Sequence, residues 1–232
     1  MICLRTVAAL AALVVLGVFS PGSAPQTTPP GAPPKSAVPK PAAAKPAAPQ
    51  RGAIDYPRIC LGASPNAPVV IEVFSDIQCP SCRDFYLGTM RQLIADYDGA
   101  GKVCTVYRDT PNHKYSLAAA RWANAASQLG VAKWFRVTEA LYAKQHEWSK
   151  AGEVEPVVAA VLTPKELARA RSLLEDPKLN AAIDADVARA RQLGVTRTPT
   201  SFVTANGKTE RIPGAIPYDI LRRYLDELLA AR

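Results

Sequence analysis

The stretch from Val69 to Cys82 constrains the fold more than any other part of the chain. Its first five residues, 69–73, are nearly all valine and isoleucine, the composition of a strand that is covered on both faces. Its last four residues are Cys-Pro-Ser-Cys. Pro80 falls where a helix would begin, because its missing N–H and fixed φ suit the first helical position. The stretch predicts a buried strand, a short turn and a helix that starts beside Cys79.

The two cysteines of this motif are placed for different tasks. Cys79 falls at the helix N-terminus, where unpaired N–H groups and the helix dipole favour an anion, so we expect its thiol to ionise easily. Cys82 follows one turn later on the same side of the helix and is near enough to form a disulfide with Cys79. The spacing predicts thiol–disulfide exchange, with Cys79 as the nucleophile and Cys82 as the resolving thiol.

A zinc site uses the same Cys-x-x-Cys spacing but needs further ligands. The other cysteines, Cys3, Cys60 and Cys104, do not form a second such pair, and the two histidines lie far away in the sequence. A Cys-x-x-Cys that directly follows a buried strand and encloses a proline is instead typical of a redox motif. We therefore expect no metal ion and no other cofactor.

The N-terminal part of the chain predicts export. An apolar run from Val7 to Phe19 follows Arg5; it has the length of the hydrophobic core of a secretory signal and is short for a membrane span. We interpret residues 1–24 as a signal peptide or an N-terminal membrane anchor. Either interpretation places the rest of the chain in the periplasm or at the extracytoplasmic face of the membrane, where disulfides persist.

Residues 25–52 consist mostly of proline, alanine and lysine, with too little apolar mass to bury. We predict a disordered linker that its prolines stiffen, either a plain spacer or a tether that holds a domain away from a membrane. Part of the formal net charge of +8 lies here, and the rest is scattered beside acidic residues. The sequence has no basic patch with interleaved aromatic residues, which argues against nucleic-acid binding.

Residues 53–232 have the pattern of a folded domain. We expect a short strand over 54–61, then the strand and helix around the cysteine motif, with that helix ending near residues 99–101. A further strand is predicted over 103–107. From 112 to 193 the apolar period is helical, so a helical block interrupts the strands.

Several smaller signals complete this domain. Thr163 to Glu166 is a capping-box pattern, and Asp176-Pro177 opens the last helix of the block. Asn206-Gly207 predicts a β-hairpin turn between strands over 200–204 and 209–212. A final helix is expected from Pro217, with an apolar face made of Ile220, Leu221, Tyr224, Leu225 and Leu228.

These features together resemble the DsbA-like branch of the thioredoxin-fold thiol:disulfide oxidoreductases. The matching parts are Val-Phe-Ser-Asp-Ile-Gln-Cys-Pro-Ser-Cys at 73–82, the helical insertion, Gly-Val-Thr-Arg-Thr-Pro-Thr-Ser-Phe at 194–202, and the closing hairpin and helix. The resemblance covers residues 53–232. It implies an α/β fold of the thioredoxin type, with a central mixed β-sheet and an inserted α-helical block at about 112–193.

The resemblance also implies roles for residues outside the cysteine motif. Pro199 would follow a cis peptide bond and pack against the active-site disulfide, and Thr198 would face the sulfurs and offer a backbone edge to a peptide. The alternative is an ordinary proline that opens a strand. Glu72 would lie beneath Cys82 and move its proton, with a pKa raised by burial. Its alternative is a position facing a solvated gap.

Two further expectations follow from the resemblance. In thioredoxin topology the first strand lies beside the strand after the active-site helix, so Cys60 and Cys104 could form a structural disulfide; the alternative is two buried free thiols. Well-known members often carry Pro-His between the cysteines, and here the dipeptide is Pro80-Ser81. The missing imidazole removes one donor to the Cys79 thiolate, which predicts a weaker oxidant.

The function that this resemblance implies is that of an exported thiol:disulfide oxidoreductase. It would act as a dithiol oxidase on reduced or misoxidised exported proteins, and a membrane-bound redox partner of the DsbB or VKOR type would reoxidise it. A reductase or isomerase of the same fold is one alternative. The other is a non-catalytic, tethered peptide-binding or chaperone module.

Overall fold

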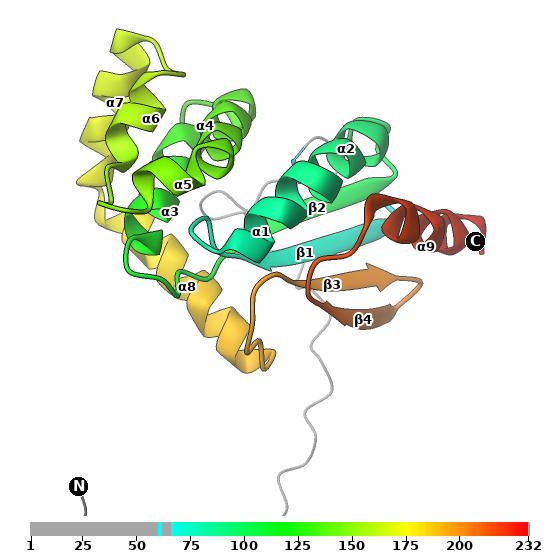
Figure 1. The fold of residues 1–232 in the computed structure, drawn as a ribbon. Helices are drawn as coiled ribbons and strands as arrows, with labels where there is room; N and C mark the ends of the chain where they lie inside the picture. Colours follow the sequence, from blue (N-terminus) through cyan, green and yellow to red (C-terminus); the bar gives the residue numbers. More distant parts are fainter. Residues whose placement is uncertain (1–59, 62–65, 232) are drawn as a thin grey trace, which may run out of the picture. The chain divides into compact units, whose positions relative to one another are not determined.

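The computed structural model of the chain describes residues 60, 61 and 66–231. Within this part, four strands form one sheet in the order β2–β1–β3–β4 (Figure 1). Strands β1 and β2 are parallel, whereas β3 is antiparallel to both β1 and β4. The strands are β1 (Val69–Ser75), β2 (Val103–Asp109), β3 (Thr200–Ala205) and β4 (Lys208–Pro213). This mixed sheet confirms the predicted α/β fold.

Strand β1 is one of the two interior strands of the sheet, the other being β3. It pairs with β2 on one edge and with β3 on the other. Its two faces are covered by different elements, because alternate residues of a strand point to opposite sides. Ile71 and Val73 belong to the main core with the active-site helix. On the other face, Phe74 packs with Phe202 of β3 and with Ala190 of α8 (Pro177–Gln192). The valine- and isoleucine-rich composition is thus explained by burial on both sides.

The helix that follows β1 is irregular. It consists of α1 (Pro80–Phe85), the π-helical segment η1 (Tyr86–Met90), α2 (Arg91–Leu93) and a second π-helical segment, η2 (Ile94–Asp98). Phe85 and Met90 are both buried although they are five residues apart, a spacing that a wider π-helical turn accommodates. The helix ends before Gly101, whose φ is 70°, as the sequence predicted.

The helical block lies between β2 and β3 in the chain and beside the sheet in Figure 1. The predicted capping box is present: Glu166 N donates to Thr163 Oγ1 and Thr163 N donates to a Glu166 carboxylate oxygen. Asp176 caps the last helix of the block by accepting from Lys178 N. The helices are α3 (Ser116–Ser127), α4 (Val131–Ala143), α5 (Gln145–Trp148), α6 (Val154–Ala159), α7 (Pro164–Leu174) and α8.

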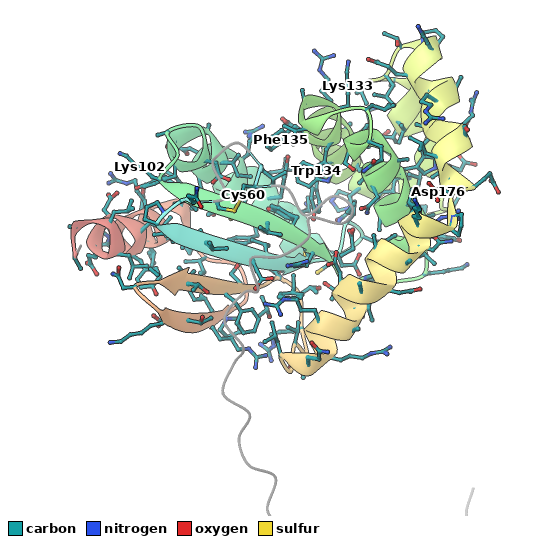
Figure 2. All side chains as sticks on the ribbon, turned by 180° about the vertical axis from the view of Figure 1, so that it is seen from behind. Cys60, Lys102, Lys133, Trp134, Phe135 and Asp176 are labelled. Carbon is teal, nitrogen blue, oxygen red and sulfur yellow. A yellow bond between two sulfur atoms is a disulfide. The ribbon has the colours of Figure 1, made fainter. Side chains whose placement is uncertain are left out.

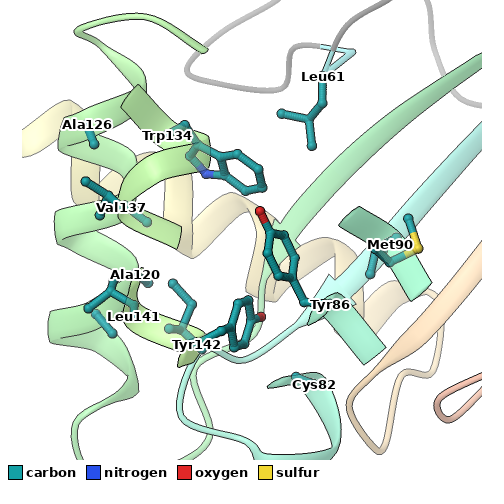
Figure 3. Packing of buried hydrophobic residues seen from close by; sticks show 14 of the residues in the cluster. Leu61, Cys82, Tyr86, Met90, Ala120, Ala126, Trp134, Val137, Leu141 and Tyr142 are labelled. Carbon is teal, nitrogen blue, oxygen red and sulfur yellow. The ribbon is translucent and has the colours of Figure 1, made fainter. Parts of the chain in front are cut away.

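Aromatic rings join this block to the active-site helix. Tyr86 of η1 stacks on Tyr142 of α4, with ring centroids 4.8 Å apart, and Trp134 of α4 packs edge-on against Tyr86 (Figure 3). Tyr107 of β2 contacts both Tyr86 and Trp134. Trp122, Trp134 and Trp148 are all buried. The insertion and the sheet therefore share one hydrophobic core.

The C-terminal part follows the sequence prediction with one exception. Asn206 and Gly207 form the hairpin turn, both with positive φ. Helix α9 (Tyr218–Ala230) begins directly after Pro217 and buries Leu221 and Leu225. The expectation that Ile220 belongs to the apolar face is wrong, because its side chain is 51% exposed.

A short segment before β1 is anchored to β2. Leu61 N donates to Thr105 O at 3.0 Å, and Cys60 forms a disulfide with Cys104, with their Cα atoms 4.7 Å apart (Figure 2). Neither Cys60 nor Leu61 is in a strand, and residues 54–59 of the strand expected over 54–61 lie outside the described residues. The expected signal or anchor at 1–24 and the linker at 25–52 also lie outside them. Among the helices that the structure describes, none is both long enough and apolar enough to cross a bilayer.

We predict that position 152 requires glycine for two reasons, its backbone conformation and its close contact with a neighbouring side chain. Its φ is 82°, and a Cβ at this position would lie 2.5 Å from Cδ1 of Tyr115. Gly101 has a φ of 70° but open space around it, so it is the matched control. Alanine in a left-handed conformation costs about 1–2 kcal/mol at either position. The clash should add about 1–3 kcal/mol to Gly152→Ala alone, as measured by urea denaturation. Equal losses for the two variants would contradict this assignment.

Candidate active site

The turn after β1 delivers Cys79 to the start of α1. Cys79 is the N-cap residue with an extended backbone, and its N–H donates to Asp76 O at 3.0 Å. Pro80 occupies the first turn of the helix, as predicted. Pro80 and Ser81 are exposed, whereas Cys82 is only 1% exposed and Cys79 is 8% exposed. The structure holds both cysteines as free thiols, with Cys79 nearer to solvent than Cys82.

The environment drives the pKa values of the two thiols apart. A hydrogen bond from the Cys82 side chain is the largest cause that lowers the pKa of Cys79, to about 5. Burial opposes it, while the Cys82 N–H and the Thr198 side chain assist it. For Cys82 the largest cause is burial, which raises its pKa far above the ordinary value, and the hydrogen bond with Cys79 raises it further. At neutral pH the reduced site therefore holds a thiolate at Cys79 and a thiol at Cys82.

Asp76 organises the turn that carries these thiols. Its N–H points at Cys82 Sγ at 3.4 Å, and its carboxylate accepts from Gln78 N at 2.8 Å. The other carboxylate oxygen accepts from Asn112 N at 2.8 Å and lies 2.7 Å from His113 Nδ1. Sequence reasoning missed this residue. The signal was a charged residue between a buried strand and a helix start, where a carboxylate can cap exposed N–H groups.

The helical block holds the same turn from the other side. The side-chain amide of Gln145, in α5, donates to Ile77 O at 2.7 Å and to Cys79 O at 3.1 Å. Tyr115 N in turn donates to Gln78 Oε1 at 2.7 Å. Gln145 is 2% exposed, so these bonds are shielded from water. The insertion thus fixes the backbone on which Cys79 sits.

The loop before β3 reaches Cys79. The Thr198–Pro199 peptide bond is cis, the geometry that the family resemblance implies. Cys79 Sγ lies 3.6 Å from Thr198 O, so residues more than a hundred positions apart in the sequence meet at this sulfur. Thr200 then opens β3, pairing with Phe74 of β1. The sequence-predicted residues Cys79, Cys82, Thr198 and Pro199 are therefore brought together.

Glu72 is not part of this group, and the expectation of a raised pKa beneath Cys82 is wrong. It lies three residues before Ser75 on β1, so its side chain points to the opposite face from the cysteines. There Arg108 Nη2 approaches one carboxylate oxygen at 2.7 Å and Arg189 Nη2 approaches the other at 2.6 Å. Burial alone would raise the pKa of Glu72, but the hydrogen bonds and charges of the two arginines outweigh it and lower the pKa.

Asp186 of α8 extends this ionic cluster. It lies 3.1 Å from Arg108 Nη1 and accepts from Asp109 N at 3.2 Å. The cluster joins β1, β2 and α8 across the face of the sheet that does not carry the thiols. We interpret this cluster as structural. In the described part of the chain, no group of three or more His, Cys, Asp or Glu side chains could hold a metal ion.

A family model described as thioredoxin matches residues 57–227 of the chain. The chain belongs to the thioredoxin family. This match covers every element of the sheet and the whole helical block. It agrees with the placement of a Cys-x-x-Cys at the start of the helix after β1 and of a cis-proline before β3.

Solved structures identify the branch of the fold. The chain is similar to α-DsbA2, a thiol-disulfide exchange protein of Wolbachia pipientis, with 26% identity and a TM-score of 0.61 over 72% of this chain and 85% of that one. α-DsbA1 of the same organism matches at 20% identity and TM-score 0.64, over 75% and 92% of the two chains. BdbD of Bacillus subtilis matches at 21% and 0.60, over 73% and 91%. The fold is DsbA-like, and family and fold together support a thiol–disulfide oxidoreductase.

The chain is also similar in sequence to part of a longer protein. The Na(+)/H(+) antiporter NhaA 3 of Salinispora tropica is 31% identical over 147 residues. The match covers 63% of this chain but only 21% of the antiporter, so the chain spans about a fifth of that protein's length.

We predict that the reactivity of Cys79 follows its lowered pKa. The rate of alkylation of the reduced protein by iodoacetamide should reach half its maximum near pH 5 and fall below that pH as the thiolate is protonated. The thiolate stabilises the reduced form; this stabilisation is full above the ordinary pKa of 9.0, is partial at neutral pH and is lost once the pH has fallen to about 5.

The variant Cys82→Ala tests the cause. It removes the largest contribution to the shift, so the midpoint should move up toward the ordinary value of 9.0. A midpoint that stays near 5 in this variant would show that the helix N-terminus, rather than Cys82, lowers the pKa.

We further predict that Glu72→Gln affects stability but not exchange. The substitution leaves Arg189 without its carboxylate partner in a mostly buried cluster, and we expect a loss of about 3 kcal/mol in the free energy of unfolding. Because the pKa of Glu72 is lowered, its contribution is full above the ordinary value of 4.5 and is lost as the pH falls below it. Urea denaturation at several pH values measures both effects.

The exposed ion pair between Arg91 and Glu139 provides the control, since Glu139→Gln should cost at most about 1 kcal/mol. A Glu72→Gln protein that is as stable as the control, or one that exchanges disulfides much more slowly than the unmodified chain, would contradict the structural role.

Proposed function

We propose that this chain is an exported thiol:disulfide oxidoreductase that oxidises dithiols in exported proteins. The observation that carries the proposal is the asymmetric pair at the start of α1. Cys79 has a pKa near 5 at the solvent side, and Cys82 is buried behind it with a raised pKa. This arrangement suits one sulfur for attack by a substrate and the other for opening and closing the disulfide.

The reaction starts from the oxidised Cys79–Cys82 pair. A substrate thiolate attacks Cys79 Sγ, a mixed disulfide forms between the substrate and Cys79, and the electron pair of the broken bond goes to Cys82 Sγ, which takes up a proton. A second substrate thiolate then attacks the substrate's own sulfur, and Cys79 leaves as a thiolate. The substrate loses two electrons to the protein, which ends as the dithiol.

The residues around the pair fit these two steps. We assign Cys79 as the nucleophile and leaving group, Cys82 as the resolving thiol, and Thr198 with Pro199 as the backbone edge along which a substrate peptide would lie. The Thr198 carbonyl lies 3.6 Å from Cys79 Sγ, so a peptide paired with this edge would bring its own cysteine next to that sulfur. Exposed Pro80 and Ser81 leave the approach to Cys79 open.

The direction of exchange follows from the lowered pKa of Cys79. A thiolate that is stable at neutral pH stabilises the reduced form of the pair, which makes its disulfide a better oxidant. The lowered pKa of Cys79 therefore favours the oxidase over a reductase or isomerase of the same fold. Ser81 supplies no imidazole next to the thiolate, so we expect a milder oxidant than one with Pro-His between its cysteines.

The proposed setting is the periplasm or the extracytoplasmic face of the membrane, with the start of the chain as a signal or anchor. This setting is proposed because of the apolar run before residue 20 and because a Cys79–Cys82 disulfide persists in an oxidising compartment. The substrates would be reduced or misoxidised exported proteins. A membrane-bound partner of the DsbB or VKOR type would reoxidise the dithiol.

The redox equilibrium of the Cys79–Cys82 pair with glutathione, together with activity on a reduced two-cysteine peptide, tests the proposal. We expect Cys79→Ser to abolish peptide oxidation. With oxidised glutathione, Cys82→Ala should accumulate a mixed disulfide between Cys79 and glutathione, because displacing glutathione to close the protein disulfide needs the second sulfur. Full activity of Cys79→Ser would refute the assignment. A potential near that of thioredoxin, about −270 mV, would favour a reductase. A pair that does not exchange at all would favour the non-catalytic binding module.

A further inference from the structure

The turn that joins β1 to α1 is completed by a side chain from the helical insertion. Inside the turn, Cys79 N donates to Asp76 O at 3.0 Å and Gln78 N donates to the Asp76 carboxylate at 2.8 Å. The carbonyl oxygens of Ile77 and Cys79 accept from the side-chain amide of Gln145, at 2.7 Å and 3.1 Å. Figure 1 shows α5, which carries Gln145, beside this turn. One side chain therefore connects α5 with the main chain on both sides of Gln78.

The orientation of the Gln145 amide is fixed by the two atoms that it contacts. An amide side chain has one oxygen and one NH₂ group, and in general either of them can face a neighbour. Both contacts here are carbonyl oxygens, which cannot donate, so the amide nitrogen faces the turn and each of its N–H bonds is used. Because Gln145 is 2% exposed, water does not compete for these hydrogen bonds.

Cys79 is restrained differently in the successive states of the proposed exchange. In the oxidised protein the covalent bond to Cys82 fixes its sulfur. In the dithiol and in the mixed disulfide that bond is absent, and in the mixed disulfide Cys79 also carries a substrate that moves. The structure shows both cysteines as free thiols, and both hydrogen bonds from Gln145 are present in this state. The side-chain amide therefore restrains Cys79 when the disulfide does not.

We propose that Gln145 is a positioning residue for disulfide closure, because it holds the main chain of Cys79 at the start of α1 while the Cys79–Cys82 bond is absent. The inference rests on the proposed exchange reaction and gives the helical insertion a part in it. Gln145 bonds two main-chain oxygens and no sulfur, so it acts on the reaction through the backbone of Cys79.

Closure requires three sulfur atoms to lie in line. After its proton has passed to the solvent, the Cys82 thiolate attacks Cys79 Sγ of the mixed disulfide; the protein disulfide forms, and the substrate sulfur leaves with the electron pair of the broken bond. Cys82 is 1% exposed and belongs to the main core, so it has little freedom to follow a displaced partner. A misplacement of about 1 Å can slow such a reaction by about a hundredfold. The position of the Cys79 backbone therefore governs the rate of closure.

Loss of the Gln145 hydrogen bonds should slow closure more than opening. Cys79 would gain freedom in the mixed disulfide, whereas in the oxidised protein the covalent bond to Cys82 would still restrain it. Closure would then have to order a more mobile residue, while opening would start from a state that is little changed. The equilibrium constant for closure should fall by the same factor as the closing rate, so the disulfide should become easier to reduce.

Trp148 provides a matched control on the same short helix. Its indole N–H donates to the carbonyl oxygen of Leu141 at 2.7 Å, and its side chain is 1% exposed. Trp148→Phe therefore removes a buried donor to a main-chain oxygen of the insertion, whereas Gln145→Met removes the buried donors to the turn. Methionine is unbranched like glutamine and has no N–H to donate. Of the two variants, Gln145→Met alone breaks a hydrogen bond to the Cys79 main chain.

Stopped-flow measurement with glutathione on the full chain separates closure from opening. Reduced protein is mixed with oxidised glutathione at concentrations at which closure of the mixed disulfide limits the rate, and oxidised protein is opened with reduced glutathione. We expect Gln145→Met to slow closure about tenfold or more and to leave the opening rate within about twofold. Trp148→Phe should leave both rates unchanged, although it lowers the free energy of unfolding. Gln145→Asn, whose amide is too short to reach both oxygens, should also slow closure, and it decides the question if Gln145→Met does not fold.

Three results would overturn the inference. The first is a closing rate in the Gln145 variants equal to that of the unmodified protein. The second is equal slowing of opening and closing, which would leave the equilibrium constant unchanged. The third is equal slowing of closure by Trp148→Phe, which would point to the packing of α5. If the unmodified protein does not exchange with glutathione, the proposed function itself fails, so the two failures are distinguishable.

Discussion

The hydrogen bond from the Cys82 thiol to the Cys79 sulfur is the interaction on which the chemistry of this site depends. It is the largest contribution to the low pKa of Cys79, and it is available because burial keeps Cys82 protonated. The burial of Cys82 therefore contributes to the low pKa of Cys79, in addition to the helix N-terminus that the sequence suggested. The Cys79 thiolate is stabilised by a neighbour that cannot itself ionise at neutral pH, so each thiol determines the charge of the other.

Strand β1 connects this pair to the rest of the molecule. It is paired on both edges and covered on both faces, and its alternation assigns each residue to one of two environments. Ser75 falls on the face of the thiols, whereas Glu72 falls on the face of the arginines. A shift of one residue would exchange them. The family resemblance placed an acid beneath the cysteine, but a resemblance does not specify the register of a side chain, and the alternation of the strand does.

Much of the fold was predictable because it depends on local signals. The Cys-Pro-Ser-Cys motif, the capping box at Thr163 and the Asn206-Gly207 turn each act within a few residues, and each is present where expected. The contacts of Asp76 and Gln145 with the active-site turn were not predictable. They join positions that are distant in the sequence, and a single sequence does not say which buried polar groups meet. The π-helical segments were missed because their spacing departs from the ordinary helical period.

The disulfide between Cys60 and Cys104 has a mechanical consequence. It closes a loop over a sequence separation of 44 residues that contains β1, the cysteine motif and the active-site helix, and the chain-entropy model assigns such a loop about 4 kcal/mol. Any force applied to the chain ahead of Cys60 passes through this covalent bond into β2. Strand β1 and the two reactive sulfurs lie inside the closed loop, so a pull on the N-terminal end bypasses them.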